Sequence, residues 1–203
     1  DETKKNLEKI INIANEKKLK TMVIFTEPHA KEFFAENSNS SSQPSRISPW
    51  RDKFQRLKAQ GVDFAFYLNF NKKLQSMTPE KFINNVLGNL NIHYLTIGDD
   101  FKFGNRRKGD YEMLENWGSL NDVTVQQTPT YLRGDRRYSS SWIREALDKD
   151  DFELAAELLG RRYTFSGKVV SGNSLGRTIG VPTANLWLPK SNLPIKGLSL
   201  IHI

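Results

Sequence analysis

Four short apolar runs alternate with amphipathic segments along the first two thirds of the chain, and this alternation constrains the fold more than any other feature. The runs occupy residues 21–25, 62–68, 92–97 and 123–125. Each has the length of a buried strand. Helical spacing over residues 3–18, cap-plus-proline starts at Ser48 and Thr78, and a helix expected to end at Gly118 fill the intervals. The alternation predicts an α/β fold with a parallel sheet covered on both faces.

The predicted topology places a ligand site beyond the carboxyl ends of the strands. Three segments fall at that edge: residues 27–30, residues 98–104, and the loop that leads to Ser139. They contain acidic, aromatic and hydroxyl side chains, and we expect them to converge on one site.

The order of elements also predicts domain limits. The α/β pattern begins with a helix, whereas a doubly wound domain usually begins with a central strand, so we expect that strand to lie upstream of residue 1. The helix expected over residues 151–159 has Gly160 as its C-cap, and a β pattern follows over residues 163–170. We therefore predict an α/β domain over residues 1–160 and the start of a second domain over residues 161–203, which are too few for an independent core.

Composition excludes several classes of protein. The chain has no cysteine, which rules out a disulfide framework and a thiolate metal site or nucleophile. No run approaches the ~20 apolar residues of a membrane helix, and no signal peptide is evident. We expect a cytoplasmic protein without a membrane partner, and its oligomeric state is left open.

The net charge of +7 permits binding of polyanions. Basic residues cluster at Lys102 with residues 106–108, and at Arg133 with residues 136–137. Solvated loops, a site for phosphate-bearing small molecules and a nucleic-acid surface are all open interpretations, and nucleic acid is the least favoured.

Three serines, Ser139, Ser140 and Ser141, precede a helical pattern. A serine N-cap stabilises a helix by ~1 kcal/mol relative to alanine, so the serines have a purely structural interpretation. Arg144 favours another one, because with Ser141 as the cap it stands where a capping box has glutamate, near the positive end of the helix dipole. Free N–H groups, hydroxyls and a guanidinium together are typical of an oxyanion site. The sequence thus predicts a nucleotide phosphate site here.

Further short motifs accompany this stretch. They include Gly98-Asp99-Asp100-Phe101, Gly176-Arg177, Pro182-Thr183-Ala184-Asn185-Leu186, and residues 25–29, 46–48 with Lys53, 61–63, 103–104, 109–110 and 157–161. Taken together and in this order, with the serine stretch, they resemble the bifunctional bacterial FAD synthetase family, a riboflavin kinase joined to an FMN adenylyltransferase. Any one motif alone is weak, but the set spans nearly the whole chain.

The resemblance implies a Rossmann-like nucleotidylyltransferase domain that joins FMN to the AMP part of ATP and releases pyrophosphate, giving FAD. It also implies that residues 161–203 begin a riboflavin kinase β-barrel, which in the intact protein transfers the γ-phosphoryl group of ATP to riboflavin. The implied ligands are ATP, Mg²⁺, riboflavin, FMN and FAD. Another small-molecule nucleotidylyltransferase and a basic nucleic-acid-binding module remain as alternatives.

The resemblance also assigns residues. Arg144 is the implied catalytic residue, stabilising charge on the phosphorus during transfer, and it binds ATP phosphates together with Ser139, Ser140 and Ser141. The implied flavin-side residues are Pro28, His29, Asp99, Asp100 and Phe103. The implied kinase ATP contacts are Gly176, Arg177, Thr183 and Asn185, and Thr183 and Asn185 are also the implied magnesium contacts. The alternatives are a polar loop position for His29, turn caps for the aspartates, and a core position for Phe103.

The sequence departs from the family pattern in three places. A His-x-Gly-His phosphate motif is absent, since the histidines are His29, His93 and His202. The segment Phe25-Thr26-Glu27-Pro28-His29-Ala30 exchanges the first two residues of the family pattern and lacks its final proline. The tail, residues 197–203, does not continue as the next barrel strand. We therefore expect weak or no adenylyltransferase activity and no kinase activity.

Overall fold

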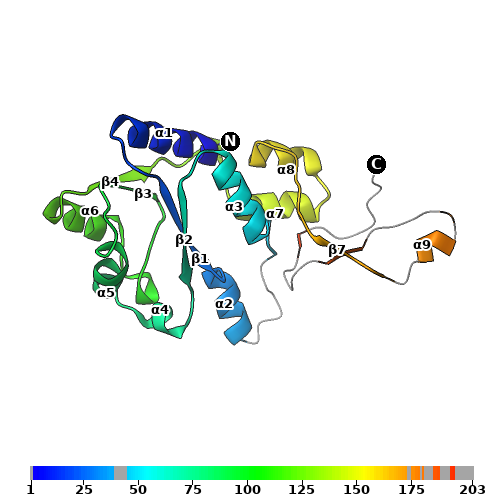
Figure 1. The fold of residues 1–203 in the computed structure, drawn as a ribbon, viewed down its shortest axis with the longest axis horizontal. Helices are drawn as coiled ribbons and strands as arrows, with labels where there is room; N and C mark the ends of the chain where they lie inside the picture. The colour runs from blue at the N-terminus through cyan, green and yellow to red at the C-terminus, as the bar shows by residue number, and fades with distance from the viewer. Residues whose placement is uncertain are drawn as a thin grey trace. The chain divides into compact units, whose positions relative to one another are not determined.

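The computed structural model describes residues 2–38, 45–172, 175–178, 180, 185–187 and 193–194 (Figure 1). It divides into two compact units. The larger unit combines Glu2–Gln43 with Gln60–Tyr138, and the smaller unit combines Pro44–Ala59 with Ser139–Ile203.

Strands and helices alternate in the larger unit, and all four predicted strands are present. The elements are α1 (Glu2–Glu16), β1 (Met22–Glu27), α2 (Ala30–Asn37), β2 (Phe64–Asn69), α4 (Lys72–Ser76), α5 (Pro79–Phe82), β3 (Tyr94–Gly98), α6 (Tyr111–Leu120), β4 (Thr124–Thr128), β5 (Leu132–Arg133) and β6 (Arg136–Arg137). A π-helical turn (Ile83–Leu87) continues α5, and a 3-10 turn (Asn105–Arg107) precedes α6.

Local signals predicted some helix limits correctly and others wrongly. Thr78 caps α5 as expected, because its Oγ1 accepts a hydrogen bond from Lys81 N at 3.3 Å. The prediction that the helix around Leu114 ends at Gly118 was wrong, since α6 continues to Leu120. A Cβ on Gly118 would lie 2.5 Å from the carbonyl oxygen of Val123, so this glycine allows α6 to approach β4 closely.

The four main strands form two parallel pairs, whereas the sequence predicted a single sheet. β1 pairs with β2, Met22 opposite Phe64, and β3 pairs with β4, Tyr94 opposite Thr124. Within the described ranges, no ladder joins β1 to β3. Alternation of strands and helices predicts parallel crossovers but does not determine which strands become neighbours. Each pair still places the carboxyl ends of its two strands at one edge.

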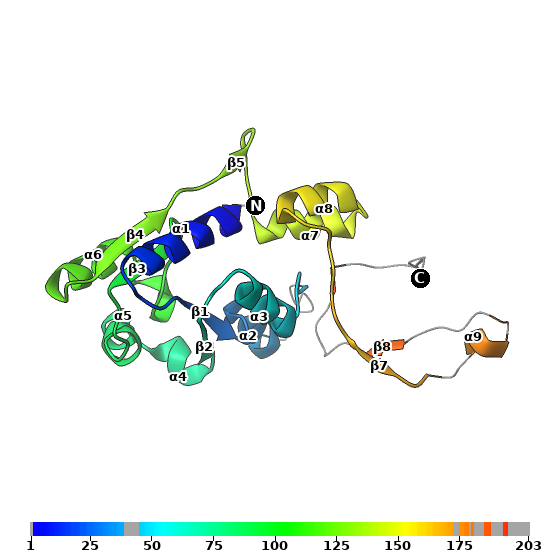
Figure 2. The ribbon, with the colours of Figure 1, turned by 45° about the horizontal axis from the view of Figure 1, so that its top comes forward.

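The core of the larger unit lies against the β3–β4 pair, where α5 and α6 cover the strands (Figures 1 and 2). Leu114 of α6 is 1% exposed and is the centre of the buried cluster. The other buried members are Ile83, Leu87, Ile97 and Phe103. Ile24 of β1 also packs against this cluster, so side chains of both strand pairs contribute to one core.

The smaller unit is mainly helical. Its elements are α3 (Trp50–Ala59), α7 (Ser140–Asp148), α8 (Phe152–Leu159), β7 (Lys168–Val170), α9 (Leu175–Thr178) and β8 (Asn185–Trp187). α7 and α8 pack around Leu147, which is fully buried. Gly160 ends α8 in the left-handed conformation, as predicted, whereas Asp151, expected within the helix, is its N-cap.

The β pattern predicted over residues 163–170 is strand only at β7, which pairs with β8 in antiparallel orientation. Hydrogen bonds to α3 hold the residues ahead of β7. The buried Asp52 accepts a hydrogen bond from Ser166 N at 2.9 Å, and Arg56 Nη2 donates to Thr164 Oγ1 at 3.1 Å. Arg56 Nη2 also donates to the carbonyl oxygen of Thr164 at 3.3 Å, so Ser166 N and this carbonyl bond to α3 side chains in place of a neighbouring strand. Over the described ranges, no helix combines the length and apolar character needed to span a membrane.

Candidate functional site

The N-terminus of α7 is capped by Ser139. Its Oγ accepts a hydrogen bond from Trp142 N at 3.2 Å, and its carbonyl oxygen accepts one from Ile143 N at 3.1 Å. The premise that Ser141 is the cap was therefore wrong, because the helix begins two residues earlier. Ser140 and Ser141 occupy the first two helical positions, and both are exposed. Hydroxyls and first-turn N–H groups thus lie together at the positive end of the helix.

Arg144 lies in the second turn of α7, not at the capping-box position. It is four residues beyond Ser140 and three beyond Ser141, so it shares their face of the helix. Its Nε donates a hydrogen bond to the carbonyl oxygen of Ser45 at 2.6 Å, and the side chain is half-buried. Because Nε belongs to the guanidinium, this bond fixes the direction of the group that carries the positive charge of this face.

The acidic turn, residues 98–101, follows directly after β3. Phe101 N donates a hydrogen bond to the carbonyl oxygen of Gly98 at 3.1 Å and closes the turn. Arg137 Nη2 donates to Asp99 Oδ1 at 2.7 Å and lies 3.4 Å from Asp100 Oδ1. The two aspartates are therefore partners of an arginine, a role that neither the turn-cap nor the flavin interpretation had included.

Phe103 is a core residue in this structure. It is 6% exposed and packs against Phe82, with ring centroids 5.3 Å apart. The ring of Phe101 stacks on it at 5.9 Å and is 38% exposed. A Cβ on Gly109 would lie 2.6 Å from the Phe103 ring, so glycine is required at that position for the ring to pack. The flavin contact assigned to Phe103 stays a prediction, and Phe101 is the ring that faces solvent.

Pro28 and His29 follow β1, at the carboxyl end of the other strand pair. His29 is the N-cap of α2: its Nδ1 accepts a hydrogen bond from Lys31 N at 3.2 Å, and its own N–H donates to Glu32 Oε2 at 3.1 Å. The structural role of His29 is thus helix capping. Its contact with flavin, and that of Pro28, remain predictions.

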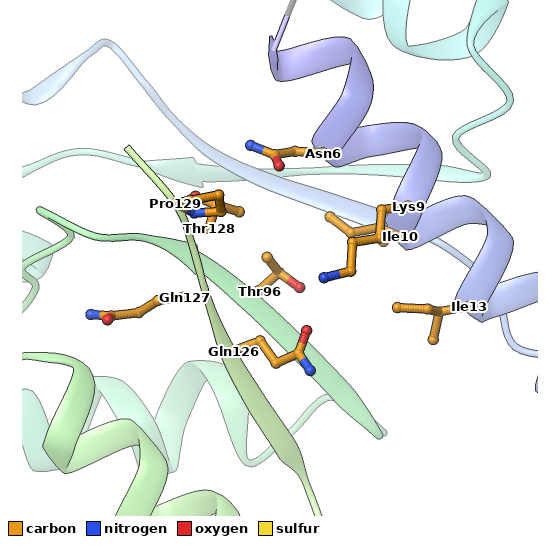
Figure 3. Close-up of a pocket in the computed structure, with 9 residues that line it drawn as sticks. All are labelled: Asn6, Lys9, Ile10, Ile13, Thr96, Gln126, Gln127, Thr128 and Pro129. Atoms are coloured by element: carbon orange, nitrogen blue, oxygen red, sulfur yellow. The ribbon is translucent and has the colours of Figure 1, made fainter. Parts of the chain in front are cut away.

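A small pocket lies between α1 and the β3–β4 pair (Figure 3). Lys9, Ile10 and Ile13 of α1 face Thr96 of β3 and Gln126 of β4 across it. Its volume is about 20 Å³, whereas a single water already needs roughly 10–15 Å³ by this measure. The pocket therefore does not hold a nucleotide in this conformation.

Charges around the acidic turn hold neighbouring loops in place. Lys102 Nζ lies 3.3 Å from Asp110 Oδ2, and Asp110 also accepts a hydrogen bond from Met113 N at 3.2 Å. The bond from Met113, and then that from Lys102, lower the pKa of Asp110 below its ordinary value. This carboxylate is therefore a structural anion that caps α6.

The residues assigned to kinase ATP and magnesium contacts lie partly outside the described ranges. Gly176 is in α9, as is the backbone of Arg177, whose side chain is not described. Asn185 begins β8, and Thr183 lies outside the described residues. In the part of the chain that the structure describes, no group of three or more His, Asp or Glu side chains is placed to hold a metal ion.

The structure brings together some predicted residues and adds two others. Asp99 and Asp100 meet Arg137, while Ser139 and Arg144 belong to the smaller unit. Arg107 Nη2 also donates to the carbonyl oxygen of Asp100, at 3.4 Å. The sequence counted Arg107 and Arg137 only as members of basic clusters. The sequence signal that could have identified these two arginines is their positive charge, which is opposite to that of the acidic turn at the same edge of the sheet.

Comparison with known proteins connects these segments to one family. A family model described as FAD synthetase matches residues 4–142, and one described as riboflavin kinase matches residues 159–200. The chain is 37% identical over 186 residues to the bifunctional riboflavin kinase/FMN adenylyltransferase of Escherichia coli (strain K12), covering 91% of this chain and 58% of that protein. It is 37% identical over 191 residues to the protein of the same name from Haemophilus influenzae, covering 94% and 61%.

The chain thus spans about three fifths of the length of these curated relatives. Among solved structures, a crystal structure described as a macrolide-efflux protein from Streptococcus pneumoniae matches with a TM-score of 0.72 and 28% identity. That match covers 95% of this chain and 62% of the other.

Proposed function

The chain belongs to the FAD synthetase family, and from this membership we propose that it serves the ATP-dependent adenylylation of FMN to FAD. Residues 1–160 are then a Rossmann-like FMN adenylyltransferase domain. The observation that carries the proposal is the FAD synthetase match over residues 4–142, which includes both the acidic turn and the serine-capped start of α7.

The reaction requires little covalent chemistry from the protein. An oxygen of the FMN phosphate forms a bond to the α-phosphorus of ATP, and the bond from that phosphorus to the oxygen bridging to the β-phosphate breaks. The products are FAD and pyrophosphate. Negative charge spreads over the phosphoryl oxygens during this exchange, so fixed N–H donors and cations aimed at them lower the barrier.

The start of α7 has the groups that this step needs. The exposed hydroxyls of Ser140 and Ser141 lie beside first-turn N–H groups that have no acceptor within the helix. Ser139 accepts from Trp142 N through its oxygen, which leaves its own hydroxyl hydrogen to be donated. Arg144 adds the positive charge on the same face and is the residue to which we assign stabilisation of the transferring group.

The flavin side combines the acidic turn with an aromatic pair. Asp99 and Asp100 supply hydrogen-bond acceptors for the single ring N–H of the oxidised flavin, at N3. Phe101 presents the exposed ring, and Phe103 supports it from the core. Pro28 and His29 form the second wall in this proposal, with α2 holding His29 through its capping bonds.

We assign residues 161–203 to the start of a riboflavin kinase domain, which in the full-length protein phosphorylates riboflavin with ATP. The riboflavin kinase match over residues 159–200 supports this assignment. Thr183 and Asn185 carry oxygen donors of the kind that Mg²⁺ prefers, and the side chain of Asn185 packs against Gly172 where a Cβ would collide with it. Bound Mg²⁺ would neutralise phosphate charge. Gly176 and Arg177 complete the proposed ATP contacts.

Fluorescence titration with FMN and with FAD, in the absence and presence of Mg-ATP, tests the proposal on the chain as given. We expect saturable quenching of flavin fluorescence and slow turnover, because no His-x-Gly-His segment is present to hold the pyrophosphate. Folding is checked by circular dichroism. A folded protein that quenches neither flavin refutes the proposal. Binding of single-stranded or duplex nucleic acid that weakens steeply with salt, with no flavin response, would support the nucleic-acid alternative instead.

A further inference from the structure

Arg137 connects the acidic turn to the hairpin formed by β5 and β6. The guanidinium is 2.7 Å from Asp99 Oδ1 and 3.4 Å from Asp100 Oδ1, and 38 residues separate Arg137 from Asp99 in the sequence. Both contacts are made by the same nitrogen, Nη2, so a single positive charge serves two neighbouring carboxylates. One arginine therefore faces both aspartates of the turn.

A second arginine holds the turn from the other direction. Arg107 Nη2 donates to the backbone carbonyl of Asp100 at 3.4 Å. Arg107 is the last residue of the 3-10 turn and has a positive φ of 56°. Arg107 thus holds the backbone of the turn, whereas Arg137 lies within ion-pair distance of its two carboxylates. The charge of Arg137 offsets part of the negative charge of the acidic turn.

Hydrogen bonds hold the base of the hairpin that carries Arg137, whose β5 strand is labelled in Figure 2. Tyr138 N donates to the carbonyl oxygen of Tyr131 at 3.2 Å and closes its base. Tyr131 Oη donates to Asn6 Oδ1 of α1 at 3.1 Å. Arg137 consequently extends from a fixed base, so its contact with Asp99 also sets the position of the turn.

We propose that Arg137 is a positioning residue for the anionic substrate: it holds the Asp99–Asp100 turn in place and offsets its charge, so that the turn can accept the N3–H of the flavin without repelling the FMN phosphate. This inference rests on the proposed function. It predicts a difference between two flavin ligands that a purely structural arginine would not produce. Loss of Arg137 weakens binding of FMN, which carries a phosphate, more than binding of uncharged riboflavin.

The test compares the Kd of FMN and of riboflavin by flavin fluorescence at low and high ionic strength. For Arg137→Gln we expect FMN binding to weaken by about three- to tenfold at low ionic strength, with less than about a twofold change for riboflavin, and a smaller FMN effect in high salt. Arg137→Lys keeps the charge and should recover most of the FMN affinity. Lys102→Gln is the matched control, since it removes one cation near the same turn whose ion-pair partner is Asp110.

The outcomes separate the two proposals. Equal weakening of FMN and riboflavin by Arg137→Gln, or the same loss of FMN affinity in Lys102→Gln, would overturn the role of Arg137 and leave the proposed function intact. Wild-type protein that binds neither flavin refutes the proposed function and this inference with it. Melting curves of all variants identify any that fail to fold, and Arg137→Lys then carries the comparison.

Discussion

Replacing Arg144 by alanine separates the structural and the nucleotide roles of α7. In the structure its Nε donates to the carbonyl of Ser45 at 2.6 Å, from a half-buried position. The alanine variant loses this hydrogen bond and leaves the carbonyl to water, which we expect to cost about 1 kcal/mol of unfolding free energy, at the low end for charged donors because the site is partly hydrated.

The nucleotide effect of the same change should be larger. Removing one positively charged donor from a phosphate contact typically costs about 10²–10³ in turnover, and a tenfold loss of affinity corresponds to about 1.4 kcal/mol. Titration with Mg-ATP in the presence of FMN, followed by flavin fluorescence, measures the affinity, and urea unfolding measures the stability. Lys149→Ala is the control, because it removes a cation from the other end of α7, where it pairs with Glu145 at 2.9 Å. If Arg144→Ala unfolds more easily but handles nucleotide like the wild type, Arg144 is only a structural residue.

Three further predictions test other parts of the structure. Leu114 is 1% exposed, and Leu114→Ala should lower the unfolding free energy by about 2–5 kcal/mol. Leu120 on the same helix is 85% exposed, and Leu120→Ala should change this free energy by less than about 0.5 kcal/mol. Urea titrations measure both values, and equal effects would contradict the assigned core. Hydrogen bonds from Thr21, and then from Lys20, lower the pKa of Asp63 to about 2, so this carboxylate contributes stability that is complete above pH 4 and is lost as the pH falls towards 2. Asp63→Asn should therefore flatten the acid limb of a stability-against-pH curve, and an unchanged limb would show that other groups produce it. Asp99→Ala should weaken flavin binding, and an unchanged Kd would remove Asp99 from the site.

The sequence by itself determined much of the local structure. Apolar runs of strand length became β1 to β4, and Thr78, Asp151 and Gly160 cap helices as their residue types predict. These features depend on residues within a few positions of one another, because helix caps and strand alternation are set by the immediate backbone. The family motifs were also readable, since they are short and contiguous.

The pairings across the chain were decided only by the tertiary structure. Arg137 meets Asp99, and Arg144 meets the carbonyl of Ser45, 99 residues away. The sequence indicated neither of these two pairings. The split into two strand pairs and the burial of Phe103 likewise depend on which segments become neighbours. The physical reason is that a charged or aromatic side chain has many possible partners of similar energy, and the path of the backbone selects among them.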